Sequence, residues 1–442
     1  MNIYRSARNI YCVGVSGVAV TAFAQIAVQE GKRVSGCDTG EVFVTDEVLK
    51  SLKIAIDHGF TSSQLPDECD LVVHTGAHGG KQNPIVLEAV RRQIPVLSIS
   101  EVMGQVFAER DQIAVCGVGG KSTISAMLAW IFEQEQLSPG YAVGVGKIHG
   151  LEWTGRAGDS HAVAVIEADE YAVDPSTDHR PRFSFLQPKI AVVTHILFDH
   201  PDIYKNETHT FQTFADFVNT VPHGGSVVIW HESLNKIKHL LRPDLNLIIV
   251  QNENIGQVTL SIPGEHNRMN AALALQAAIQ AGVPTEHAMH HLKKFRGTMR
   301  RLDDHGEKAG FYIFDDYGHH PNELQAAIQA IREWRPSDRV VVLFEPHTYS
   351  RTKHLKDDFV IALSTADEIY LLDIFPSARE EIDPSISSDD LVQDLVHRGK
   401  SAKNLHTISQ AASYLLAQTP SVPTTLLTLG AGNVYQVIDH LE

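Results

Sequence analysis

The sequence predicts an α/β protein with three domains, each built around a mostly parallel β-sheet. Short apolar runs of strand length alternate with helix-length segments along the chain, which is the pattern of doubly wound sheets. The length of 442 residues corresponds to about three domains of ordinary size. We place the boundaries near residues 108 and 298, which gives domains at 1–108, 109–298 and 299–442.

The first domain is predicted from strands at 10–20, 71–76 and 95–100, with helical segments between them. The loop 14-GVSGVA-19 resembles the dinucleotide-binding fingerprint G-x-G-x-x-G, with Ser16 and Ala19 in place of two glycines. Asp38 follows at the end of the next strand. This loop indicates a site for a nucleotide diphosphate, but by itself it does not separate NAD from a UDP-sugar.

The second domain opens with 114-AVCGVGGKSTISAMLAW-130. Three glycines let several backbone N–H groups point at one anion, and Lys121 adds a positive charge. Apolar residues then recur at helical spacing: Ile124, Met127, Leu128 and Ile131. A helix therefore begins near Ser122 with its N-terminus toward the anion, and the Ser122 hydroxyl suits Mg²⁺. The loop G-x-x-G-K-S-T is a partial Walker A motif, and we predict a phosphate site rather than an ordinary glycine-rich turn.

Two further strands of the second domain, at 162–170 and 190–196, end in polar residues. Ligands bind beyond the carboxyl ends of strands in open α/β sheets, so these positions are candidates for a site. Glu167, Asp169 and Glu170 close the first strand and offer carboxylates to the Mg²⁺ of a bound nucleotide, although an acidic surface turn is the alternative. The second strand leads to Asp199, His200 and Asp202 near the same edge.

The third domain is predicted from strands at 310–318, 339–346, 368–375 and 425–432. The loop 315-DDYGHHPNE-323 gathers groups that are costly to bury without purpose, which favours a site. In 347-HTYSRTK-353, Arg351 suits bidentate binding of a carboxylate. Before this domain, 264-GEHNRMN-270 places His266, Asn267 and Asn270 at a helix start, where asparagine serves either a purine edge or a helix cap.

Composition favours small-molecule partners. The formal net charge of −16 argues against nucleic acid and anionic membranes. The four cysteines show no CxxC spacing, and the sequence has no secretory or membrane-spanning pattern, so we expect no membrane insertion and a cytoplasmic location. We expect a monomer or a weak homodimer.

These segments, in this order, resemble the Mur ligase family over essentially the whole chain. The matching segments are Gly117 with 120-GKST-123, 167-EADE-170, 199-DH-200, 264-GEHNRMN-270, 295-FRGTMRR-301, 315-DDYGHHP-321, 345-EPHTYSRT-352 and 430-GAGNV-434. The resemblance implies an N-terminal Rossmann-like domain for a UDP-sugar, a central P-loop-type ATPase domain and a C-terminal Rossmann-like domain for the incoming amino acid. It also implies ATP and Mg²⁺ as cofactors, and amide synthesis on the carboxylate of UDP-N-acetylmuramate through an acyl phosphate.

The resemblance also implies roles for individual residues. Lys121 contacts the β/γ-phosphates, Ser122 and Glu170 help hold one Mg²⁺, and His200 matches a second metal position. The ATP residues implied are Gly117, Gly120, Lys121, Ser122, Thr123, His266, Asn267, Asn270, Arg301 and Asp316. The UDP-sugar residues implied are Gly14, Ser16, Gly17, Asp38, Thr75 and Asn83. The amino-acid residues implied are Tyr317, His319 and Arg351, and the catalytic set implied is Lys121, Glu170, His200, His319 and Arg351.

The resemblance is closest to the branch of the family that uses L-alanine, but the amine stays open. The segment between Tyr171 and Phe185 is longer than in that branch and resembles the branch that ligates a murein tripeptide. Two other classes are also open: a nucleotide-binding paralogue without activity, and a nicotinamide-dependent oxidoreductase supported by 14-GVSGVA-19 and Asp38 alone.

Overall fold

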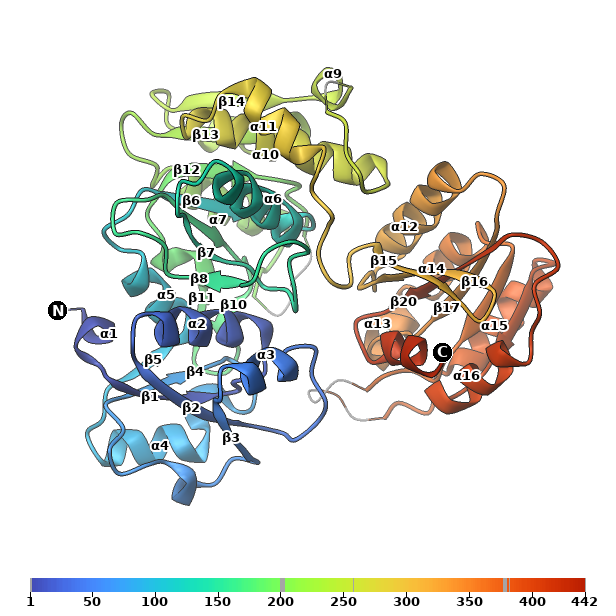
Figure 1. Ribbon diagram of the computed structural model, residues 1–442, viewed down its shortest axis with the longest axis horizontal. Coiled ribbons are helices and arrows are strands. Elements are labelled where there is room, and N and C mark those ends of the chain that lie inside the picture. Colours follow the sequence, from blue (N-terminus) through green and yellow to red (C-terminus); the bar gives the residue numbers. More distant parts are fainter. Residues whose placement is uncertain (1, 199–202, 257, 377–379, 381, 442) are drawn as a thin grey trace. The chain divides into compact units, whose positions relative to one another are not determined.

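A computed structural model describes residues 2–198, 203–256, 258–376, 380 and 382–441. The chain divides into two compact units (Figure 1). The first comprises residues 1–261 and 268–296, and the second comprises residues 262–267 and 297–442. Three main sheets form the protein, two in the first unit and one in the second. The predicted three-domain α/β fold is confirmed.

The first sheet has five parallel strands in the order β3-β2-β1-β4-β5. The strand order reverses beside β1, where doubly wound sheets bind ligands. The strands are β1 (Asn9–Val13), β2 (Arg33–Asp38), β3 (Ala55–His58), β4 (Leu71–His74) and β5 (Val96–Ser98). The helices are α1 (Ile3–Ser6), α2 (Val18–Gln29), α3 (Asp46–Ser51), α4 (Pro84–Arg91) and α5 (Ile99–Val106), with the 3-10 turns η1 (Ser62–Gln64) and η2 (Gly80–Gln82).

The apolar run at 10–20, predicted as one strand, is a strand only as far as Val13. Gly14 has a φ of 79°, which turns the backbone out of the extended conformation. Gly17 then caps α2, and the last residues of the run, Val18 to Val20, form its first turn, in which Val20 is buried and the other two are partly buried. Apolar content alone did not separate the end of the strand from the start of the helix.

The second sheet has seven strands in the order β14-β13-β12-β6-β9-β7-β8, parallel except for the β7–β8 pair. The strands are β6 (Gln112–Cys116), β7 (Gly140–Ala142), β8 (Gly155–Arg156), β9 (Ala164–Glu167), β12 (Pro188–Val193), β13 (Ser226–Trp230) and β14 (Asn246–Val250). The helices are α6 (Lys121–Gln134), α7 (Glu207–Val218), α8 (His231–Ile237), α9 (Asn252–Ile255), α10 (Glu265–Gln280) and α11 (Thr285–Leu292), with η3 (Arg182–Phe185) and η4 (Lys238–Leu240). A separate antiparallel hairpin comprises β10 (Ala172–Asp174) and β11 (Asp178–Pro181).

The third sheet has six strands in the order β15-β16-β20-β17-β18-β19, of which only the β15–β16 pair is antiparallel. The strands are β15 (Asp303–Lys308), β16 (Phe311–Asp316), β17 (Arg339–Phe344), β18 (Glu368–Leu371), β19 (Ser401–Asn404) and β20 (Thr424–Leu429). The helices are α12 (Pro321–Trp334), α13 (Tyr349–His354), α14 (Lys356–Leu363), α15 (Ser388–His397) and α16 (Ile408–Leu416), with η5 (Val434–His440). Apolar clusters lie on both faces of this sheet, as expected for strands covered by helices on each side.

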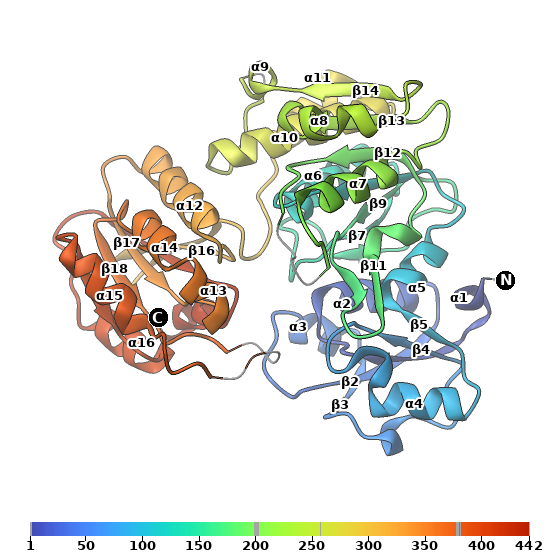
Figure 2. The ribbon, with the colours of Figure 1, turned by 180° about the vertical axis from the view of Figure 1, so that it is seen from behind.

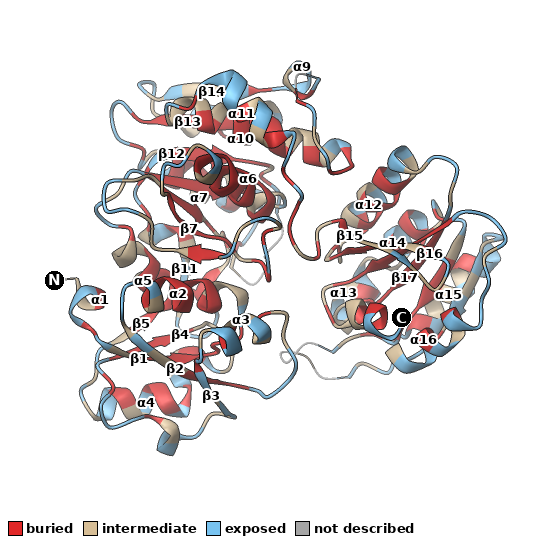
Figure 3. Cartoon of the chain, in the orientation of Figure 1, coloured by how far each residue is buried: buried red, intermediate tan, exposed pale blue. Residues whose placement is uncertain are grey.

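One apolar core joins the first two sheets. It runs from Ile10 in β1 through Phe23 in α2 to Ile166 in β9 and Phe214 in α7. Helices α2 and α5 lie between the first sheet and the second-domain elements β8 and β11, whereas α4 covers the other face of the first sheet (Figures 1 and 2). Both α2 and α6 are buried over most of their length (Figure 3). The first two domains therefore form one packed body.

Buried polar contacts fix the register between α2 and β8. The Gln25 amide nitrogen donates to Thr154 Oγ1 at 2.9 Å, and Gln25 Oε1 accepts from the backbone nitrogens of Thr154 and Gly155 at 2.9 and 3.0 Å. A Cβ at Gly155 would lie 1.9 Å from the carbonyl oxygen of Ala22, so glycine is required for this approach. Among the described residues, no helix is both long and apolar enough to span a membrane.

We predict that Gly155→Ala lowers the free energy of unfolding of the first unit by about 1–3 kcal/mol, because the added methyl group would overlap a helix backbone that cannot rotate away. Urea denaturation followed by tryptophan fluorescence measures this change. Gly256→Ala is the matched control, since Gly256 has a φ of −65° and a Cβ added there would meet open space. Equal stabilities of the two variants would contradict the packing argument.

Candidate active site

The predicted phosphate loop connects β6 to α6. Gly117, Gly119 and Gly120 have φ values of 119°, 79° and 79°, and α6 begins at Lys121, one residue before the predicted start. A Cβ at Gly117 would lie 2.2 Å from Thr194 Oγ1, and one at Gly120 would lie 2.3 Å from Asn270 Oδ1. A Cβ at Gly119 would meet open space. The loop therefore requires glycine at all three positions for conformation and at two of them also for space.

The end of β12 supports this loop. Thr194 Oγ1 donates to the Gly119 carbonyl at 2.9 Å, and the Val118 nitrogen donates to the His195 carbonyl at 2.7 Å. The Thr194 carbonyl in turn accepts from Ser233 Oγ at 2.7 Å. Hydrogen bonds from a neighbouring strand and helix thus hold the loop in shape.

Lys121 meets the acidic end of β9. Its Nζ lies 2.7 Å from Glu170 Oε2 and 3.8 Å from Asp169 Oδ1, and it donates to the Gly117 carbonyl at 3.0 Å. Burial by itself lowers the pKa of Lys121, but attraction by Glu170, Asp169 and Glu167 outweighs burial and raises the pKa above its usual value. The lysine, which directly follows the glycine loop, is therefore positively charged, as phosphate binding requires.

Ser122 contacts Glu167 rather than Glu170. Ser122 Oγ donates to Glu167 Oε1 at 2.6 Å, and the other Glu167 oxygen accepts from the Gly144 nitrogen at 2.8 Å. Burial and repulsion by Asp169 raise the pKa of Glu167. The sequence marked Glu167 only as part of an acidic strand end, and nothing in it identified this carboxylate as the partner of Ser122.

The oxygen donors at the base of the loop fit Mg²⁺ in chemical type, since Mg²⁺ prefers hydroxyl, carboxylate, phosphate and water oxygens. Ser122, Glu167 and Glu170 supply such oxygens. Among the described residues, no cluster of three or more histidine, cysteine or acidic side chains is arranged to hold a metal without other ligands. His200, predicted at a second metal position, lies outside the described residues, as do Asp199 and Asp202.

The polar residues of the segment 264–270 contact different parts of the protein. Asn270 packs against Gly120 of the phosphate loop. The Asn267 amide donates to the Pro263 carbonyl at 2.6 Å, and the His266 ring lies against the Gly264 backbone. The side chain of Asn270 therefore lies at the glycine loop, and the role in ATP binding predicted for Asn270, Asn267 and His266 stays a prediction.

Most of the predicted UDP-sugar residues lie around the start of α2, whereas Asn83 lies at the start of α4. Asp38 is buried, and its oxygens accept from the backbone nitrogens of Ser16 at 2.9 Å and Thr39 at 2.8 Å. Thr75 packs on Gly14, whose missing side chain leaves room for the threonine methyl group. Asn83 is also buried, but its oxygen caps α4 at the Ile85 nitrogen and its amide donates to the His78 carbonyl. Its amide group is thus used inside the protein, and its contact with a UDP-sugar stays a prediction.

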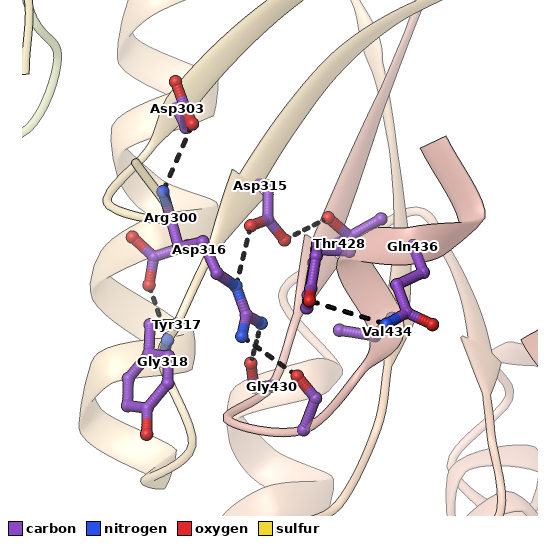
Figure 4. A network of polar contacts seen from close by, with 12 residues as sticks. Arg300, Asp303, Asp315, Asp316, Tyr317, Gly318, Thr428, Gly430, Val434 and Gln436 are labelled. Atoms are coloured by element: carbon purple, nitrogen blue, oxygen red, sulfur yellow. Dashed lines mark hydrogen bonds and ion pairs between the residues drawn. The ribbon is translucent and has the colours of Figure 1, made fainter. Parts of the chain in front are cut away.

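In the second unit, the pair of arginines before β15 has two different environments. Arg300 is buried in a network in which it donates to Asp315 Oδ2 at 3.1 Å and to the carbonyls of Gly430 and Gly432 at 2.5 and 2.9 Å (Figure 4). Arg301 is half-buried, with its guanidinium 5.2 Å from the centre of the Tyr317 ring. The sequence does not distinguish two adjacent arginines, and it gave no sign of the structural role of Arg300.

Asp316 lies beside this network. Its two oxygens accept from the backbone nitrogens of Leu302 at 2.8 Å and Gly318 at 2.7 Å. Burial raises the pKa of Asp316 to about 6, against the attraction of Arg301. A carboxylate whose ionisation falls near neutral pH is common at functional sites, although ion-pair networks also produce such shifts.

The residues predicted for the incoming amino acid form an aromatic cluster around His347. The ring centres of Tyr317 and His319 lie 5.5 Å apart, and those of His319 and His347 lie 6.1 Å apart. Arg351 Nη1 lies 3.4 Å from His347 Nδ1. Burial lowers the pKa of His319, which favours its neutral form. The structure therefore brings Tyr317, His319 and Arg351 together, and it adds His347, which the sequence showed only as part of the Arg351 segment.

Comparison with known proteins agrees with this architecture. Three models of the Mur ligase family match: the catalytic domain at 9–111, the middle domain at 115–246 and the glutamate ligase domain at 300–432. The chain is 31% identical to the UDP-N-acetylmuramate--L-alanine ligase of Desulfitobacterium hafniense, over 97% of this chain and 98% of that protein.

Solved structures show the same fold. The UDP-N-acetylmuramate-alanine ligase of Thermotoga maritima superposes with a TM-score of 0.80 at 21% identity, over 98% of both chains. The UDP-N-acetylmuramate:L-alanyl-γ-D-glutamyl-meso-diaminopimelate ligase of Neisseria meningitides has a TM-score of 0.59 at 26% identity, over 67% of this chain and all of that one.

Three α/β domains with a glycine-lysine-serine loop on the central sheet define an ATP-dependent ligase. The chain belongs to the Mur ligase family. This membership answers the question left by 14-GVSGVA-19, because it makes the protein a ligase rather than a nicotinamide-dependent oxidoreductase.

We predict that Asp316 makes the stability of the second unit depend on pH between about 4 and 6. Its pKa is raised from 3.8 to about 6 in the folded state, so the unfolded chain ionises first. The contribution of Asp316 to the free energy of unfolding is fully present below pH 4, and it is lost as the pH rises through 6. Unfolding free energies of the wild type and Asp316→Asn, measured from pH 4 to 8, should show the wild type losing stability relative to the variant over this window. A constant difference at every pH would contradict the shifted pKa.

Proposed function

We propose that this protein joins L-alanine to the carboxylate of UDP-N-acetylmuramate, with ATP converted to ADP and phosphate. The observation that carries the proposal is the match to an L-alanine ligase over 97% of the chain. The half-buried Lys121 beside a glycine loop supports it, because phosphorylation of a carboxylate brings two anions together and needs a fixed positive charge.

The first chemical step forms an acyl phosphate on the sugar carboxylate. We propose that Lys121 holds the β/γ-phosphates and that the N-terminus of α6, with Gly117, Gly120 and Thr123, surrounds them. Mg²⁺, held by Ser122 and Glu170 with Glu167 nearby, would neutralise phosphate charge when bound. We propose that His200 binds a second metal ion. The residues that we propose to contact the nucleoside part of ATP are His266, Asn267, Asn270, Arg301 and Asp316.

The second step is attack by the amine, with release of phosphate. We propose that Arg351 binds the α-carboxylate of the amino acid and that Tyr317 shapes its pocket. His319, kept neutral by burial, can accept a proton from the ammonium group so that the nitrogen becomes a nucleophile. We assign the UDP-sugar to Gly14, Ser16, Gly17, Asp38, Thr75 and Asn83, and keep the domains at 1–108, 109–298 and 299–442.

A second candidate is the ligation of a murein tripeptide instead of L-alanine. The observation that favours it is the segment after Glu170, which forms the β10–β11 hairpin and η3, together with the 26% identity to the tripeptide ligase of Neisseria meningitides. The amine itself distinguishes the two reactions.

The test is phosphate release from the purified protein with ATP, Mg²⁺ and UDP-N-acetylmuramate, comparing L-alanine, L-serine, glycine and L-Ala-γ-D-Glu-diaminopimelate. Release that requires the sugar and L-alanine supports the main proposal, and release with the tripeptide alone supports the second candidate. No release with any amine, despite ATP binding, would indicate an inactive paralogue and overturn both. The same assay without Mg²⁺ tests whether phosphate release requires the metal.

We predict that Lys121→Ala lowers kcat by about two orders of magnitude or more, because a preorganised charge is removed from the transition state. Steady-state phosphate release measures the effect. Lys189→Ala is the matched control, since Lys189 is half-exposed and pairs with Asp111 on the surface. Unchanged turnover in Lys121→Ala would refute the phosphate assignment.

Arg351→Ala should mainly raise the KM for the amine, because binding of a carboxylate contributes to the ground and transition states alike. Initial rates over a range of amine concentrations measure the change. Lys353→Ala, in the same helix, is the control, since Lys353 is exposed and pairs with Asp383. A change confined to the KM for ATP would show that Arg351 is misplaced.

A further inference from the structure

A cavity of about 110 Å³ lies inside the first unit, between the helices of the first domain and the strand ends of the second. Helices α2 and α5 contribute an apolar wall that includes Ala19, Ala22 and Met103. Strand β9 and the segment that follows it contribute a charged wall with Glu167, Asp169 and Arg182. The cavity therefore suits a small group that is apolar on one side and charged on the other.

Two polar side chains on the cavity wall have unused hydrogen-bonding capacity. Arg182 Nη1 donates to the Tyr171 hydroxyl at 3.2 Å and lies 3.8 Å from Asp169 Oδ2, but Nε has no hydrogen-bond partner among the described residues. Ser100 is 7% exposed, and its Oγ also lacks a partner within the described part of the chain. Buried polar atoms are rarely left unpaired, so both residues indicate a missing acceptor.

Asp169 bridges Arg182 and Lys121, the lysine of the phosphate loop. Asp169 lies 3.8 Å from Lys121 Nζ through one oxygen and 3.8 Å from Arg182 Nη1 through the other. Glu167, which lines the cavity, bonds Ser122 in the first turn of α6. An anion bound by Arg182 would therefore lie close to the phosphates that Lys121 is proposed to hold.

The backbone around Arg182 is firmly anchored. Its nitrogen donates to the Tyr171 carbonyl, and the Phe183 nitrogen donates to the Asp169 carbonyl, both at 3.0 Å. The preceding hairpin is tied to the first domain by Asp174, which is fully buried and accepts from the Lys81 nitrogen at 2.8 Å. The guanidinium is thus presented from a rigid support, which reduces the entropy lost when a ligand binds.

We propose that this cavity binds the acid arm of UDP-N-acetylmuramate, with Arg182 positioning its carboxylate for phosphorylation. The arm is a lactyl ether, whose methyl group suits the wall formed by Ala19, Ala22 and Met103, and whose carboxylate suits a guanidinium. The inference rests on the proposed function and gives a role to the extra segment between Tyr171 and Phe185. Arg182 acts by holding the nucleophile rather than by supplying protons.

The test compares two ligands that differ in this arm. Binding of UDP-N-acetylmuramate and of UDP-N-acetylglucosamine, which lacks the acid arm, is measured by calorimetry without ATP for the wild type, Arg182→Ala, Arg182→Lys and Arg180→Ala. Arg180 is the matched control, because it lies two residues before Arg182, at the end of the hairpin, but is half-exposed and pairs with Asp178. Retained ATP binding shows that each variant is folded.

The proposal requires Arg182→Ala to weaken binding of UDP-N-acetylmuramate by roughly tenfold or more, with UDP-N-acetylglucosamine affected less than twofold. Arg182→Lys should recover part of the loss, and Arg180→Ala should resemble the wild type. Equal weakening of both ligands, or no weakening, would overturn the assignment of Arg182 while leaving the proposed function in place. Failure of the wild type to bind UDP-N-acetylmuramate would overturn both.

Discussion

The site depends on the charge buried where β9 ends. Glu167, Asp169 and Glu170 lie within a few residues of one another. Lys121 faces them from the start of α6, and Arg182 lies beside Asp169. Like charges this close are unfavourable in a protein interior unless cations and hydrogen bonds compensate for them. The glycines of the phosphate loop permit that compensation, because any side chain at Gly117 or Gly120 would displace the polar groups of Thr194 or Asn270.

The first two domains share one apolar core, which holds their loops in a fixed arrangement. The contacts of Gln25 with Thr154 and of Asp174 with the Lys81 backbone nitrogen hold the loop 14-GVSGVA-19 and the predicted phosphate loop in one body. Reacting groups that are held in one body lose little entropy on meeting, which favours a reaction between two bound substrates. The β10–β11 hairpin is fixed to the first domain through Asp174.

Much of the site could be predicted from local sequence. The phosphate loop, the acidic end of β9 and the loop after β16 are each continuous segments, and the chemistry of each depends on residues a few positions apart. Pairings between segments could not be predicted in this way. The hydrogen bond from Ser122 to Glu167 joins two segments that are far apart in the chain. The packing of β16 against β20 brings Arg300 to the carbonyls that follow β20, while Arg301 stays half-buried.

The sequence by itself determined the α/β fold class, the order of the three domains and the residues predicted to bind phosphate, because strand and helix periodicity and glycine-rich loops are local properties of the chain. The tertiary structure decided that Glu167 is the carboxylate that bonds Ser122. It also decided that one core joins two domains and that Arg182 and Ser100 line a common cavity. These depend on contacts between residues far apart along the chain, such as Gln25 and Thr154, whose distances follow from how sheets and helices pack and not from spacing along the sequence.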